Sequence, residues 1–156
     1  ACAGRPLQRI DTFFSGEDPV SVREVWRHTQ CGTDATETKL TLFADRDDLL
    51  RWAAERRLPL VWSAGGLPGG GAYVLVDLGQ RPAAGHAVAI SAAAGQRAGT
   101  LMLRGTFFAP SDPDAVAQPE SPCVLVNLPP DRFDAVRLYD QNGELRATAL
   151  QITPVP

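Results

Sequence analysis

The sequence predicts a mainly β domain, a twisted antiparallel barrel or sandwich of about eight strands with one covering helix. Short runs that alternate apolar and polar residues recur along the chain and are separated by turn residues, which is typical of strands. Asn142-Gly143 lies between two such runs, and Asn-Gly is a strong signal for a β-hairpin turn. Only the stretch from Asp45 to Pro59 has a convincing helical pattern.

Two strands are predicted before the helix. Val20 to His28 and Glu37 to Ala44 both alternate apolar with polar side chains. In the second run Leu40 and Leu42 share one side, so that side is expected to face the core.

The helix is predicted to begin after Asp45, whose side chain can accept hydrogen bonds from the free amides of the first turn. Pro59 would end it, because proline cannot continue a helix. Leu49, Leu50 and Ala53 share one face, so we expect the helix to pack this stripe against a sheet.

The segment from Ala72 to Ile90 is the centre of the predicted fold. It alternates up to Leu78 and again from Val88, which favours a strand, a tight connection and a returning strand. The connection is the predicted partner-binding loop, because loops on a rigid scaffold commonly carry binding residues. Its residues are Gly79, Gln80, Arg81, Pro82, Ala83, Ala84, Gly85 and His86.

The rest of the chain supplies further predicted strands. Ala92 to Gly99 contains two glycines and is interpreted as a turn before a strand over Ala98 to Arg104. Cys123 to Leu128 is an apolar strand closed by two prolines. Ala135 to Asp140 and Glu144 to Gln151 form the hairpin around the Asn-Gly turn.

Length and charge limit the classes of function. The chain has 156 residues, which fits one β-rich domain over residues 13–156 after an N-terminal tether of residues 1–12. The net charge is -3 and the basic residues are scattered, so no positive surface for a nucleic acid is predicted. No run approaches the roughly 20 apolar residues that a membrane-spanning helix needs.

The three cysteines indicate an exported protein. Ala1-Cys2-Ala3-Gly4 looks like the end of a bacterial lipoprotein signal, so Cys2 is the predicted lipidation site; the alternative is an ordinary cysteine. In an oxidising compartment Cys31 and Cys123 would form a disulfide; the alternative is two buried thiols. The expected location is the bacterial cell envelope, periplasmic or surface-exposed, with a lipid anchor on Cys2.

No catalytic, metal or cofactor site is predicted. The two histidines, His28 and His86, belong to no recognisable catalytic signature, and the expectation for the chain is that it is not an enzyme. His28 and Cys31 supply two ligand types at a plausible spacing, but no second pair follows to complete a metal site.

From Tyr73 to Pro129 the pattern resembles the C-terminal domain of PrcB-type accessory subunits of bacterial surface protease complexes. The residues that carry the resemblance lie in a family-like region over residues 70–129 and are Leu78-Gly-Gln-Arg-Pro-Ala-Ala-Gly-His86 and Glu120-Ser-Pro-Cys-Val-Leu-Val-Asn-Leu-Pro129. Here Ala83-Ala84 replaces the family's small polar pair, His86 its tyrosine, and Cys123 another tyrosine. The resemblance implies a non-catalytic lipoprotein that stabilises or docks a protease.

Two alternatives use the same scaffold. The segment from Pro82 to His86 is faintly similar to a loop of chagasin-type cysteine-protease inhibitors, which insert a rigid loop into the active-site cleft. A small-ligand-binding β-barrel is the third hypothesis, and it would require an apolar cavity inside the fold.

Overall fold

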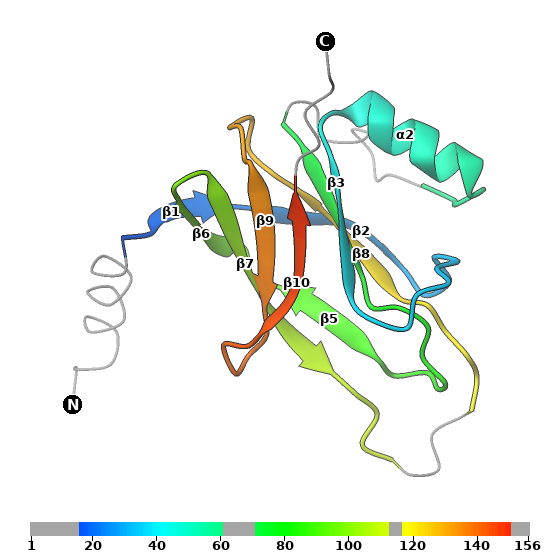
Figure 1. Cartoon of the computed structure of the whole chain (residues 1–156). Helices are drawn as coiled ribbons and strands as arrows, with labels where there is room; N and C mark the ends of the chain where they lie inside the picture. Colours follow the sequence, from blue (N-terminus) through cyan, green and yellow to red (C-terminus); the bar gives the residue numbers. More distant parts are fainter. Residues whose placement is uncertain (1–15, 61–70, 113–116, 151–156) are drawn as a thin grey trace, which may run out of the picture.

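Two β-sheets face one another in the computed structural model, which describes residues 16–60, 71–112 and 117–150 (Figure 1). The described residues contain ten strands and one helix. The strands are β1 (Asp18–Ser21), β2 (Arg23–His28), β3 (Lys39–Phe43), β4 (Tyr73–Asp77), β5 (Ala87–Ile90), β6 (Ala93–Arg97), β7 (Thr100–Phe108), β8 (Cys123–Asn127), β9 (Ala135–Tyr139) and β10 (Leu145–Leu150), and the helix is α2 (Arg46–Glu55).

The two sheets differ in their strand order. Sheet A runs β1-β6-β7-β9-β10, and β5 also pairs with β7. Sheet B runs β2-β8-β4-β3, with every pair antiparallel. β3 and β10 lie alongside one another, but no strand pairing joins them within the described residues (Figure 1). The prediction of a mainly β fold is therefore confirmed, and of the two predicted architectures the structure is the sandwich.

The main core fills the space between the sheets, and β4 explains how it forms. Val74, Val76 and Leu78 alternate along the chain and face sheet A, where they pack in one cluster with side chains such as Leu101 and Leu138. The strand alternation in the sequence predicted this face correctly, because side chains at every second position of a strand point the same way.

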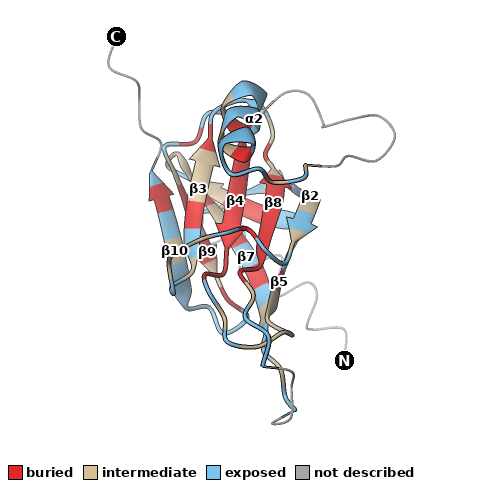
Figure 2. Cartoon of the chain, turned by 90° about the vertical axis from the view of Figure 1, so that its right-hand side faces the viewer, coloured by how far each residue is buried: buried red, intermediate tan, exposed pale blue. Residues whose placement is uncertain are grey.

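The opposite face of β4 is also buried. Tyr73 and Leu75 pack in a second cluster together with Leu49 of α2. Figure 2 shows α2 in front of the upper end of the buried strand β4. The sandwich therefore has a third, partial layer on the outer side of sheet B.

The helix follows its sequence signals, with one correction. The Asp45 side chain accepts a hydrogen bond from the Asp48 N–H at 2.9 Å, so Asp45 is the N-cap as predicted. Leu49 and Ala53 are buried, but Leu50 is 37% exposed and does not belong to the packed stripe. A helix residue next to the buried stripe turns away from the sheet because successive side chains are about 100° apart.

The predicted hairpin over Ala72 to Ile90 is wrong. β4 pairs with β3 on one edge and with β8 on the other, so no edge is left for a returning strand. β5 instead belongs beside β7 in the other sheet. The loop Gly79 to His86 is consequently a crossing between the two sheets.

The segment from Ala92 to Gly99 differs from the sequence prediction. Most of the predicted turn over Ala92 to Gly99 is strand β6, and only Ala98 and Gly99, both with positive φ, make the turn to β7. Position 95 of this strand is a glycine because the Glu17 side chain lies over it, and a Cβ there would meet that carboxylate.

The predicted strand over Val20 to His28 divides at Val22. β1 pairs with β6 in sheet A, whereas β2 pairs with β8 in sheet B. The Val22 N–H donates to the Ala92 carbonyl at 3.0 Å, and its side chain is buried between the sheets. One continuous stretch of chain thus joins the two sheets.

The hairpin around Asn142-Gly143 is confirmed. β9 and β10 pair antiparallel, and Gly143 adopts a φ of 78°, which glycine accepts without strain. Within this hairpin the Leu138 side chain is buried.

The predicted disulfide is present in the structure. Cys31, which follows β2, is bonded to Cys123 at the start of β8, with a Cα–Cα distance of 6.1 Å. Both cysteines are buried in the outer cluster beside Leu75 and Leu125. The predicted lipidation site, Cys2, and the tether lie outside the described residues.

We expect reduction of this disulfide to lower the free energy of unfolding by up to about 4 to 5 kcal/mol, because its sequence separation of 92 residues strongly restricts the unfolded chain. Urea denaturation of the oxidised and the reduced protein measures this loss. A Cys31→Ala/Cys123→Ala variant serves as the control, since its stability should not respond to reductant. Titration of more than one thiol in the unreduced, unfolded protein would contradict the pairing.

Candidate functional site

Four loops meet at one end of the sandwich, which we call the loop end. They connect β2 to β3, β4 to β5, β7 to β8 and β9 to β10, and the described parts are residues 29–38, 78–86, 109–112, 117–122 and 140–144. This end lies opposite α2 and is at the bottom of Figure 2. The predicted binding loop, Gly79 to His86, is the central one of the four because it borders each of the cavities described below.

The first part of the loop is held by backbone hydrogen bonds to two neighbouring loops. The Gln80 N–H donates to the Ala35 carbonyl at 2.7 Å. Arg81 and Glu120 form an antiparallel bridge in which each N–H donates to the other carbonyl, at 2.7 and 2.9 Å. The backbone of this part of the loop is therefore fixed before any partner binds.

Gly79 is required where the loop leaves β4. Its φ is +79°, and a Cβ there would lie 2.9 to 3.0 Å from backbone atoms of Ala35, Thr36 and Glu37. Any other residue would combine a disfavoured backbone conformation with a clash against backbone.

The second part of the loop faces outward. Pro82 and Gly85 are exposed, while Ala83, Ala84 and His86 are half-buried. Gly85 also has a positive φ, and a Cβ there would lie 3.1 Å from the Pro110 Cβ. The loop thus presents its tip on a fixed base.

Three surface cavities border the same segment. A cavity of about 580 Å³ lies between Arg81, Glu120 and residues of the β2–β3 loop. A second, of about 300 Å³, lies between Arg81, Phe107 and the β9–β10 hairpin. A third, of about 240 Å³, lies between His86, His28 and the start of β8.

The third cavity brings together the chain's two histidines, which lie 58 positions apart in the sequence. His28 comes from the end of β2 and His86 from the end of the binding loop. The His28 ring stacks on Trp26, with ring centroids 5.5 Å apart. Among the described residues, no group of three or more His, Cys, Asp or Glu side chains is placed to hold a metal ion.

The β9–β10 hairpin forms a wall of the second cavity, and sequence reasoning did not assign it to the site. Asp140 Oδ1 accepts hydrogen bonds from the N–H groups of Asn142 and Glu144, at 2.9 and 3.0 Å. Desolvation raises the pKa of the Asp140 carboxyl. These hydrogen bonds and the nearby Arg146 lower the pKa by more than desolvation raises it, so the net shift is downward. Asp140 is therefore held as a carboxylate.

Aromatic and amide side chains complete this wall. The Arg146 guanidinium lies 4.1 Å from the centroid of the Phe107 ring. The Gln141 side chain accepts from the Phe107 N–H and donates to its carbonyl, both at 2.9 Å, and so takes the place of a neighbouring strand. Only the Asn-Gly turn could have pointed to the hairpin, and it predicts the turn but not what the turn contacts.

The outer edge of β5 is covered by two side chains of β2. Glu24 accepts a hydrogen bond from the Ile90 N–H at 2.7 Å, and Arg27 donates to the Val88 carbonyl at 3.3 Å. Glu24 and Arg27 also form an ion pair at 2.8 Å. The edge that follows the binding loop is thus partly closed.

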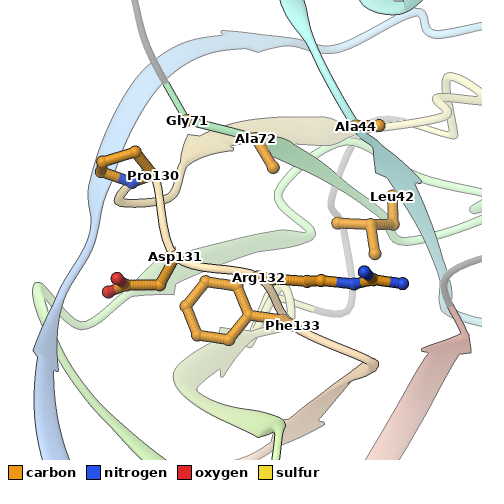
Figure 3. A pocket seen from close by; sticks show the side chains of 8 residues that line it. All are labelled: Leu42, Ala44, Gly71, Ala72, Pro130, Asp131, Arg132 and Phe133. Atoms are coloured by element: carbon orange, nitrogen blue, oxygen red, sulfur yellow. The ribbon is translucent and has the colours of Figure 1, made fainter.

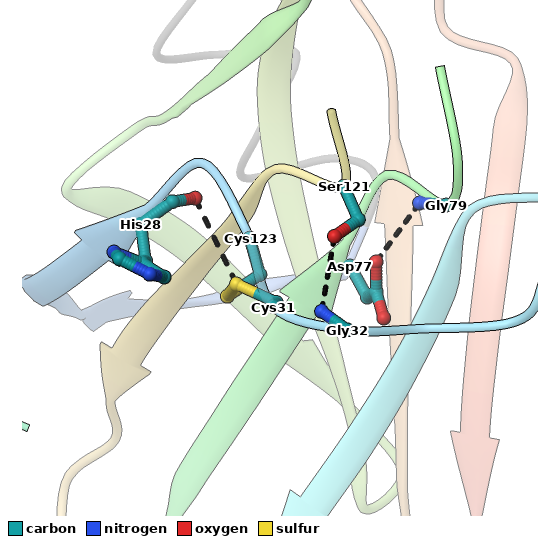
Figure 4. The surroundings of a disulfide bond; sticks show 7 residues. All are labelled: His28, Cys31, Gly32, Asp77, Gly79, Ser121 and Cys123. Atoms are coloured by element: carbon teal, nitrogen blue, oxygen red, sulfur yellow. Dashed lines mark hydrogen bonds between the residues drawn. A yellow bond between two sulfur atoms is a disulfide. The ribbon is translucent and has the colours of Figure 1, made fainter. Parts of the chain in front are cut away.

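The disulfide supports the base of the loop end (Figure 4). Next to Cys31, the Gly32 N–H donates to Ser121 Oγ at 3.0 Å, which ties the β2–β3 loop to the segment before β8. Cys31 Sγ lies 3.7 Å from the His28 carbonyl oxygen. Cys31 is therefore engaged in structure and is not paired with His28 as a nucleophile.

Asp77 lies under the binding loop and is buried. Its Oδ1 accepts a hydrogen bond from the Gly79 N–H at 2.9 Å (Figure 4). Burial raises the pKa of the Asp77 carboxyl above its ordinary value, while this bond, the Thr33 hydroxyl and the charges of Lys39 and Arg56 act in the opposite direction.

A separate cavity of about 280 Å³ lies at the other end of the sandwich (Figure 3). Its lining includes Leu42, Phe133 and the exposed Asp131 and Arg132. It contains no residue of the predicted site and is therefore a reference surface for that site.

The described helix is too short and too polar to cross a membrane.

Comparisons with protein-family models, with curated proteins and with solved structures found no match to this chain.

We expect Gly79→Ala to lower the free energy of unfolding by about 2 to 4 kcal/mol, from a strained φ and a backbone clash. The control is Gly32→Ala, because Gly32 has a similar φ of +72° but no atom within 4 Å of a new Cβ. It should lose only about 1 kcal/mol. Equal losses in urea denaturation would show that the contact with residues 35–37 is unimportant.

A neutral side chain at position 77 should stabilise the protein at pH 7. Asp77→Asn keeps an oxygen that can accept from the Gly79 N–H but removes the buried charge. Because the pKa of Asp77 is raised in the folded state, the wild type gains stability from this group as the pH falls.

The advantage of Asp77→Asn, measured by urea denaturation, should therefore be largest at pH 7 and shrink toward the ordinary carboxyl pKa of about 4. Asp77→Ala removes the hydrogen-bond acceptor as well as the charge, so it should be destabilising both at pH 7 and at about pH 4. An advantage that does not change with pH would contradict the raised pKa.

Proposed function

We propose that this chain is a non-catalytic envelope lipoprotein, anchored through Cys2, that binds a protein partner at the loop end. The partner is a protease of the envelope or cell surface, which the chain stabilises or docks. This identification of the partner rests on the PrcB-like pattern from Tyr73 to Pro129.

The observation that carries the binding proposal is the convergence of three cavities on one loop. Cavities of about 580, 300 and 240 Å³ all border residues between Leu78 and Ala87. The base of this loop is fixed by hydrogen bonds to two other loops, while its tip is exposed. A fixed backbone loses little conformational entropy on association, so such a surface is suited to binding.

The second candidate function is inhibition of a protease, and the same fixed loop favours it. An inhibitor of the chagasin type would insert the tip from Pro82 to His86 into an active-site cleft, where a rigid loop resists rearrangement. By contrast, the small-ligand hypothesis gains no support from the core, because the buried side chains between the sheets pack against one another.

The test is affinity capture from an envelope extract of the source bacterium, with the domain as bait and mass spectrometry for identification. We expect the wild type to retain a protease and the Pro82→Glu/Ala84→Glu variant to retain at least about tenfold less, because charged bulk on the tip disrupts a packed interface. Both positions accept a side chain without the positive φ that constrains Gly79 and Gly85.

The matched control is Arg132→Glu, which changes charge in the reference cavity at the opposite end. It should leave capture unchanged, and thermal unfolding should show that all variants are folded. A retained protease with intact activity supports the accessory role, whereas loss of its activity supports inhibition. Equal capture by the loop variant and the wild type would contradict the loop end as the binding surface.

A further inference from the structure

Arg81 differs from the other arginines that line the loop-end cavities. Arg27 is paired with Glu24, and Arg146 contacts both Asp140, at 3.3 Å, and the Phe107 ring. The Arg81 side chain has neither a hydrogen bond nor an ion pair with any of the described residues, and its Nε atom is buried without a partner.

An unpaired buried donor is unusual in a folded protein. Most buried polar atoms are hydrogen-bonded, and a donor left without a partner destabilises the fold by its lost hydration. The Arg81 backbone cannot easily move to relieve this, because both its N–H and its carbonyl are bonded to Glu120. The guanidinium group therefore extends from a fixed point, on a residue that is only partly buried.

The charges around Arg81 limit which kind of acceptor group can bind there. Arg81 lines both the 580 Å³ and the 300 Å³ cavity, so this residue lies between the two. The acidic residues Asp34 and Glu120 line the first cavity and Asp140 lines the second. A phosphate dianion would be repelled by these carboxylates, whereas a single carboxylate carries less charge and matches the two parallel N–H donors of a guanidinium.

An apolar contact lies next to this position. Phe108 lines the 300 Å³ cavity and is 52% exposed, one of four exposed large apolar side chains among the described residues. Aromatic residues and arginines are the residue types that contribute most to protein interfaces. A ligand that combines a carboxylate with an adjacent apolar side chain would satisfy both Arg81 and Phe108.

We propose that Arg81 binds a carboxylate of the protein partner, supplied by an Asp or Glu side chain whose apolar neighbour packs on Phe108. This inference rests on the proposed function, because it specifies the partner chemistry of the same surface.

The first experiment uses a defined probe. The peptide acetyl-Phe-Glu-Phe-amide is titrated into the ¹⁵N-labelled full chain, and the Arg81 Nε–H signal is followed by NMR. We expect a saturable shift, and at least about tenfold weaker binding of acetyl-Phe-Gln-Phe-amide, because a hydrogen bond to a charged group is lost. An Arg81 signal that does not move, or moves equally with both peptides, would overturn the proposal.

Variants separate geometry from charge. Because these variants lack the Arg81 Nε–H, peptide binding is followed in them by the backbone N–H signals of residues 78–86. Arg81→Gln should abolish binding of the peptide, and Arg81→Lys should weaken it, because lysine keeps the charge but lacks the bidentate fork. The control Arg132→Gln, at the opposite end, should bind like the wild type. Inorganic phosphate serves as the competing anion, and tighter binding of phosphate than of the Glu peptide at Arg81 would contradict a carboxylate ligand.

Capture of the partner by Arg81→Gln distinguishes this proposal from the proposed function. We expect capture to fall, as it does for the loop variant. If the loop variant loses the partner while Arg81→Gln keeps it, the loop end remains the binding surface and the role of Arg81 is wrong. If both variants keep the partner, both proposals are wrong.

Discussion

The burial of β4 on both faces is the constraint on which the rest of the structure depends. Val74 and Val76 pack into the space between the sheets, while Tyr73 and Leu75 pack under α2. Because β3 and β8 occupy its two edges, every side of the strand is covered by protein. Such a strand needs both a second sheet and an outer layer, and the chain supplies them with sheet A on one side and with α2 and the disulfide on the other.

The position of the loop end follows from this arrangement. A chain that leaves a strand paired on both edges has to leave the sheet, and here it crosses to β5 in sheet A. The crossing is narrow, so Gly79 lies against the backbone of residues 35–37, and Arg81 pairs with Glu120 beyond it. The packing that buries β4 therefore also fixes the backbone from which Arg81 and the exposed tip are presented.

The fixed backbone of the loop end determines how this surface would bind a partner. Its base is part of the fold, held by the disulfide, by the Gly32–Ser121 hydrogen bond and by the buried Asp77. Binding at the tip would require little ordering of backbone, so affinity would depend on side-chain contacts and on the unpaired guanidinium. The same property suits a docking surface and an inhibitory loop, which differ in the surface of the protease that they meet.

The sequence by itself determined the mainly β fold class, the N-cap at Asp45, the Asn-Gly hairpin and the alternation of β4, and it favoured the cysteine pairing. These are local signals, or in the case of the cysteines a count, and each can be read without knowing which segments meet. Only the tertiary structure decided that β4 and β5 belong to different sheets, that Ala93–Arg97 is a strand, and that Arg81 lies beside Phe107 and the β9–β10 hairpin. Alternation specifies which side chains of a strand face inward, but the partner at each strand edge is chosen by packing across the whole chain.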